Sequence, residues 1–110
     1  MILCPGPYIC AEWDLGGLTY WLLREKDIVV RTNDQIYMSP VTDYFTELFK
    51  RLKPHMYHNG GNIIMVQVEN EYGSYAACDH TYLEHICVLT QALLGKESNY
   101  LPQTELVNRT

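Results

Sequence analysis

The run IIMVQV at residues 63–68 limits the possible folds more than any other stretch of the sequence. It is β-branched and almost continuously apolar, which is typical of a strand buried in a parallel sheet. Glu69, Asn70 and Glu71 follow it directly. A buried carboxylate is costly unless it is paired or neutralised. Acids clustered at the end of a hydrophobic strand therefore indicate a functional site.

The rest of the pattern predicts two βα units. A short first strand is expected within residues 2–12, interrupted by Pro5-Gly6-Pro7, and a short helix at 18–25 includes Trp21, which we assign to the core. The second strand is the run at 63–68.

Two amphipathic helices follow the strands. Ser39 is the expected N-cap of the first, Pro40 suits its first helical position, and Pro54 stops it. The second spans about 80–94 and is closed by Gly95. Its expected core face is Tyr82, Ile86, Leu89 and Leu93, flanked by Leu83 and Leu94.

The strand ends predict where a ligand binds. In parallel α/β folds, ligands bind beyond the carboxyl ends of the strands. Glu12 and Glu71 each follow such an end, so we expect both to face one pocket. Strict alternation places Gln67, Glu69 and Glu71 on one face of the strand and Asn70 on the other. If Asn70 and Glu71 touch one ligand, the strand must bulge or end there.

A plainer interpretation of these acids stays open. Glu69 would then be a solvated acid at a strand end, and Glu71 a charge at a helix N-terminus. Trp13, Tyr72 and Tyr75 could present their ring faces to a ligand, but we expect each of them to pack in the core.

Charge and length exclude some classes of function. The 110 residues carry a formal net charge of −5, from 8 basic and 13 acidic residues. This balance argues against nucleic acid as a partner. No apolar run reaches the roughly 20 residues of a membrane span. MILCPGPYIC lacks the basic leader of a signal peptide, so none is expected in this chain.

A metal site is the rival interpretation. Cys78, His80, His85 and Cys87 are four residues of metal-binding type within ten positions. Their spacing matches no usual zinc pattern, and we expect neither a metal nor another cofactor.

Two long stretches resemble a known family. GGNIIMVQVENEYG, residues 60–73, is similar to the active-site signature of glycoside hydrolase family 35, the β-galactosidases, with Asn62 in place of the family's proline. GPYICAEWDLGGLTYWLLREKDIVVR, residues 6–31, resembles the preceding strand and loop of the animal lysosomal type. Cys4 and Thr19 depart from the usual arginine and proline of the family. The similarity covers residues 1 to about 95, and we expect 96–110 to be a divergent tail.

The resemblance implies a fold and site roles. The fold class would be α/β, as a fragment of a (β/α)8 TIM barrel with about two βα units. Glu71 would be the general acid/base of a retaining β-galactosidase. Asn70 would bind the sugar 2-hydroxyl, while Ala11, through its backbone, and Glu12 would bind other galactose hydroxyls.

The resemblance also implies what lies outside this chain. The nucleophile would come from a strand after residue 110, so the isolated chain is expected to be inactive. Cys78 would form a disulfide with a cysteine beyond residue 110, and the location would be lysosomal or secreted. The alternatives are a non-catalytic galactoside-binding pseudoenzyme and a small zinc module.

Overall fold

The computed structural model describes residues 1–98 and 100–102. Three parallel strands pair in the order β1-β2-β3. The strands are β1 (Ile2–Gly6), β2 (Met65–Val68) and β3 (Tyr100–Pro102), and the α-helices are α1 (Gln35–Leu52) and α2 (His80–Leu94). Short 3₁₀ helices occupy the connections, at Asp14–Gly17, Tyr20–Arg24, Lys53–His55, Tyr57–Asn59 and Tyr72–Ser74.

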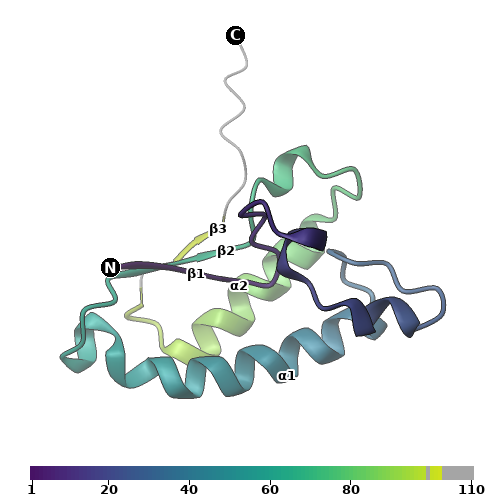
Figure 1. Cartoon of the computed structure of the whole chain (residues 1–110). Coiled ribbons are helices and arrows are strands. Elements are labelled where there is room, and N and C mark those ends of the chain that lie inside the picture. The colour runs from purple at the N-terminus through teal and green to yellow at the C-terminus, as the bar shows by residue number, and fades with distance from the viewer. Residues whose placement is uncertain (99, 103–110) are drawn as a thin grey trace, which may run out of the picture.

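The two helices and the sheet form two layers. Both helices are crossover connections between neighbouring parallel strands, and such crossovers are right-handed, which places them on the same face of the sheet. Figure 1 shows α1 and α2 packed together beneath the strands, with the loops that follow β1 and β2 gathered at one end. The predicted order of two βα units is confirmed.

The core lies between these layers. Val66 and Val68 of β2 are buried against the helices, while the exposed Ile2 and Cys4 of β1 mark the uncovered face of the sheet. Most of the largest core side chains come from α1 and α2, and the tilted rings of Phe45 and Phe49 have their centroids 4.6 Å apart. The buried helical residues are Tyr37, Met38, Val41, Phe45, Phe49, Tyr82, Leu83, Ile86, Thr90 and Leu94.

The helix α2 agrees with the prediction in its bounds and partly in its face. It spans His80–Leu94, and Gly95 follows it with a φ of 99°. Asp79 caps its start, accepting hydrogen bonds from the amides of Thr81 and Tyr82. Leu83 and Leu94, expected as flanking residues, are buried, whereas Leu89 and Leu93 of the expected core face are only partly buried.

The predicted start of α1 is wrong. The N-cap is Asp34, whose side chain accepts a hydrogen bond from the amide of Ile36, and Pro40 lies inside the helix. Proline removes one intrahelical hydrogen bond. The helix continues through it because the turn before Pro40 already buries Tyr37 and Met38.

Two further expectations differ from the structure. Trp21 is 52% exposed and is not a core residue. Its 3₁₀ helix buries Leu22 instead. The expected tail contributes β3, which pairs in parallel with β2 at residues 100–102, whereas residues 99 and 103–110 lie outside the described part.

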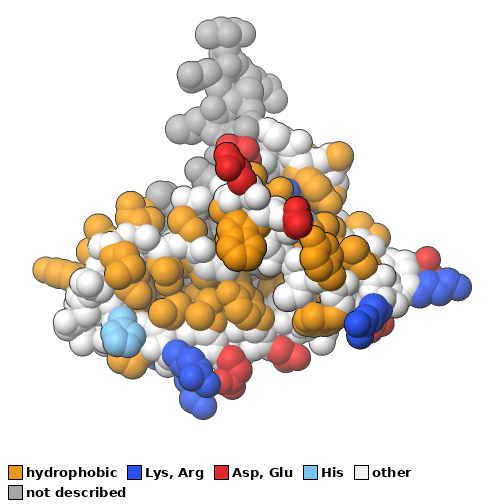
Figure 2. Space-filling view, in the orientation of Figure 1, with side chains coloured by type: hydrophobic (Ala, Val, Ile, Leu, Met, Phe, Trp, Pro, Cys, Tyr) orange, Lys and Arg blue, Asp and Glu red, His pale blue; other side chains and the backbone are white. Residues whose placement is uncertain are grey.

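Many large hydrophobic side chains are exposed to solvent. Figure 2 shows hydrophobic side chains spread over the face between the sheet and α1. Among the described residues, no helix is both long and apolar enough to cross a membrane.

Candidate functional site

A small cavity of about 150 Å³ lies beyond the carboxyl ends of β1 and β2. Asn70 and Glu71 both line it, although strict alternation would separate them. The explanation is that β2 ends at Val68. The full lining is Tyr8, Cys10, Arg31, Asn70, Glu71, Ser74 and Tyr75.

The turn after β2 brings Asn70 and Glu71 to one cavity. The amide of Glu69 still donates to the carbonyl of Gly6 at 2.9 Å, so the pairing with β1 persists for one residue. Glu69 then adopts a φ of 65° and Glu71 a φ of 46°. Positive φ is uncommon outside glycine. Two such residues on either side of Asn70 redirect the chain out of the strand geometry.

Glu69 is buried and ion-paired. The residue is 2% exposed, and Arg31 Nη2 donates to its Oε2 at 2.6 Å. Arg31 Nε donates to the same oxygen at 3.1 Å. The interpretation of Glu69 as a solvated acid is therefore wrong. A buried carboxylate persists because it is paired and hydrogen-bonded.

Tyrosines complete the surroundings of Glu69. The Tyr82 hydroxyl of α2 donates to Glu69 Oε1 at 2.5 Å. The hydroxyls of Tyr82 and Tyr37 lie 3.4 Å apart, which extends the network to α1. Burial raises the pKa of both phenols, so both stay protonated donors at neutral pH. The carboxylate of Glu69 thus joins β2, α1, α2 and the Arg31 loop.

Arg31 lies between two aromatic rings. Its Cζ is 3.8 Å from the centroid of the Tyr8 ring and 4.3 Å from that of Tyr75. The Tyr72 hydroxyl donates to the Arg31 carbonyl at 2.7 Å, which gives buried Tyr72 a structural role. Gly16 makes room for Tyr8, since a Cβ there would lie 1.9 Å from Tyr8 Cε2.

Arg31 was not among the predicted site residues. The signal available in the sequence was indirect: a carboxylate at the end of a buried strand requires a cationic partner. The sequence alone does not say which of the 8 basic residues supplies it.

Ala11 and Glu12 lie apart from the cavity. Both side chains are exposed, and neither residue belongs to the lining, to which Cys10 contributes from the same loop. Cys10, Ala11 and Glu12 have φ values of 59°, 45° and 57°. The structure therefore does not bring Glu12 and Glu71 together in one pocket. The sugar-binding roles of Ala11 and Glu12 stay predictions.

The four residues of metal-binding type, Cys78, His80, His85 and Cys87, do not come together at one point. Cys78 Sγ lies 3.7 Å from His80 Nε2, whereas His85 Nδ1 lies 2.7 Å from Asn33 Oδ1. Within residues 1–98 and 100–102, no group of three or more His, Cys, Asp and Glu side chains could hold a metal ion.

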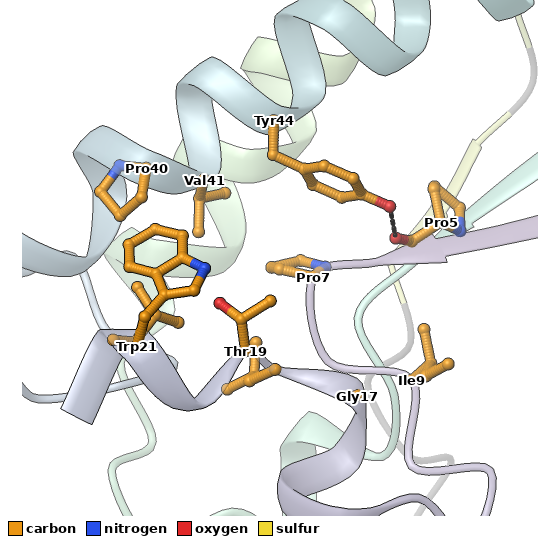
Figure 3. A pocket seen from close by; sticks show the side chains of 11 residues that line it. Pro5, Pro7, Ile9, Gly17, Thr19, Trp21, Pro40, Val41 and Tyr44 are labelled. Atoms are coloured by element: carbon orange, nitrogen blue, oxygen red, sulfur yellow. Dashed lines mark hydrogen bonds between the residues drawn. The ribbon is translucent and has the colours of Figure 1, made fainter.

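A larger cavity lies elsewhere and is apolar. It measures about 250 Å³ and opens between β1, α1 and the loop that follows β1. Figure 3 shows Trp21, Pro7 and Tyr44 around it, with the Tyr44 hydroxyl bonded to the carbonyl of Pro5. It contains none of the predicted site residues, so the smaller polar cavity is the better candidate for chemistry.

Comparison with known proteins finds one matching family model and several similar relatives. The model of glycosyl hydrolases family 35 matches residues 1–105. The chain is 56% identical over 97 residues to a mouse β-galactosidase and 56% identical over 95 residues to a mouse β-galactosidase-1-like protein. These alignments cover 88% and 86% of the chain. A Dictyostelium discoideum β-galactosidase is 51% identical over 87% of the chain. The chain spans only 14–15% of the length of these relatives.

Proposed function

Because the chain belongs to glycosyl hydrolases family 35, we propose that it carries the acid/base half of a retaining β-galactosidase site. The observation that carries this proposal is the convergence of Asn70 and Glu71 on one polar cavity beyond the strand ends. The substrate would be a terminal β-galactoside. Relatives from mouse and Dictyostelium discoideum are named β-galactosidases, which supports this substrate class.

Glu71 would act twice in the reaction. In the first step its protonated carboxyl donates to the glycosidic oxygen, while a second carboxylate attacks the anomeric carbon. In the second step the Glu71 carboxylate removes a proton from the water that hydrolyses the glycosyl-enzyme. The exposed side chain of Glu71 leaves room for a leaving group and for that water.

The second carboxylate would come from a later strand of a complete barrel. Retaining glycosidases place the two carboxyls about 5–5.5 Å apart. The uncovered face of the three-stranded sheet supports a barrel, in which this face would point inward. Asn70 would hold the sugar 2-hydroxyl, and Ala11 and Glu12 would bind other hydroxyls. A lysosomal or secreted location belongs to the same proposal.

A chimera tests the catalytic role. The corresponding segment of the mouse β-galactosidase is replaced by the aligned 97 residues of this chain, and release of 4-nitrophenol from its β-galactoside is measured. We expect an active chimera, and Glu71→Ala should slow release by about 10²–10⁴-fold. Azide should restore turnover in this variant and yield β-galactosyl azide, because azide needs no general base.

The matched control is Glu84→Ala, which removes an exposed carboxylate on α2. Its activity should equal that of the unsubstituted chimera. An active chimera that is indifferent to Glu71→Ala would refute the assignment. A folded, inactive chimera that still binds galactose, and binds it more weakly after Asn70→Ala, would favour the non-catalytic alternative.

A further inference from the structure

We propose that Arg31 is the positioning residue for the Asn70–Glu71 pair, acting through the main chain rather than on the substrate. This inference rests on the proposed function of Glu71 and identifies what holds that residue in place. Arg31 Nη2 donates to the Asn70 carbonyl at 2.6 Å, in addition to its bonds with Glu69. One guanidinium thus holds the main chain at Asn70 and the side chain of Glu69.

The turn at residues 69–71 needs stabilising contacts because its backbone conformation is energetically unfavourable without them. Glu69 and Glu71 both occupy the left-handed region, at φ values of 65° and 46°. Backbone strain of this kind persists only where surrounding contacts enforce it. The Arg31 bond to the Asn70 carbonyl falls between the two strained residues. The amide of Asn70 is also fixed, since it donates to Glu69 Oε2 at 3.1 Å.

The guanidinium itself is firmly placed. Arg31 is 5% exposed and lies against the faces of Tyr8 and Tyr75. Arginine presents planar, forked donors, so one side chain can bind a carboxylate and a carbonyl together. Lysine has a single ammonium group and no planar fork to stack between rings. Arg31→Lys should therefore keep the ion pair with Glu69 and lose the bond to Asn70.

The first test uses the unsubstituted 110-residue chain. A guanidinium fixed at Nε and Nη2 should show separate, slowly exchanging Nη signals in nitrogen-detected NMR. Arg24, which is exposed on its 3₁₀ helix, is the internal control and should show averaged signals. Averaged signals at Arg31 would overturn the proposal without any substitution.

The second test is Arg31→Lys. We expect the φ-dependent scalar couplings of Glu69 and Glu71 to change while the resonances of the α1–α2 core stay in place. Unchanged couplings in a folded variant would overturn the proposal. If this variant does not fold, the double variant Arg31→Met/Glu69→Leu replaces it, because apolar isosteres often substitute for a buried ion pair without loss of stability. If neither folds, the Nη signals decide the question.

Galactose separates this inference from the proposed function. The sugar should shift the side-chain amide signal of Asn70 in the unsubstituted chain and should lose this effect in Arg31→Lys. Arg24→Lys should bind like the unsubstituted chain. If galactose does not shift the Asn70 signal in the unsubstituted chain, only the sugar site is contradicted. The scalar couplings of Glu69 and Glu71 then still test the role of Arg31.

Discussion

At the scale of single residues, Glu69 shows why the sequence reveals the acidic cluster but does not assign a role to each of its two glutamates. A carboxylate that directly follows a buried strand predicts a site, and a cavity lined by Asn70 and Glu71 does lie beyond the end of β2. The sequence does not separate two glutamates two positions apart into a buried structural residue and an exposed one. That separation depends on the chain turning at Glu69 and on Arg31, which lies 38 residues earlier.

The network around Glu69 predicts a specific cost for one hydroxyl group. Tyr82→Phe removes the donor 2.5 Å from Glu69 Oε1 and leaves a buried carboxylate oxygen one partner short. We expect the free energy of unfolding to fall by about 1–3 kcal/mol, measured by urea denaturation.

Tyr44→Phe is the matched control for that measurement. Its hydroxyl also donates a hydrogen bond, to the carbonyl of Pro5 at 3.2 Å, but the side chain is 49% exposed. Water can replace this donor, so a change below about 0.5 kcal/mol is expected. Equal losses in the two variants would contradict the structural importance of the Glu69 network.

At the scale of elements, patterns that are local in sequence were predicted well. The helix α2 has an aspartate cap, continuous apolar periodicity and a terminal glycine, and its bounds agree with the prediction. The start of α1 was misplaced because Ser39-Pro40 forms a good local start signal. Tertiary packing overrides it, since Tyr37 and Met38 before Pro40 are fully or almost fully buried.

Two alanine substitutions test the corrected start of α1. Asp34→Ala removes an acceptor for the amides of Ile36 and Val29, at 3.3 and 3.2 Å. We expect a loss of about 0.5–2 kcal/mol in the free energy of unfolding. Ser39→Ala changes an exposed side chain inside the helix and should stay within about 0.5 kcal/mol. A larger loss for Ser39→Ala than for Asp34→Ala would restore the original prediction.

At the scale of the whole molecule, both the sheet and the candidate site are incomplete among the described residues. One face of the sheet lacks a covering layer among the described residues, and the cavity carries the predicted acid/base without a second carboxylate assigned to attack. The topology was predictable from two βα patterns, whereas β3 was not, because its short segment shows no alternation. The displacement of Ala11 and Glu12 from the cavity was equally hidden, since it depends on three consecutive left-handed residues.

Because no second carboxylate lines the cavity among the described residues, we predict that the isolated 110-residue chain does not hydrolyse 4-nitrophenyl β-galactoside. On the proposed mechanism Glu71 would protonate the leaving oxygen, but among the described residues no second carboxylate lines the cavity to form the glycosyl-enzyme. Nitrophenol release should therefore equal that of buffer. Glu71→Gln should change nothing. Release above the buffer rate that disappears in Glu71→Gln would mean that a nucleophile lies within these residues. Glu12, the acid at the other strand end, would then be the first to substitute, and the proposal of a half-site would have to be abandoned.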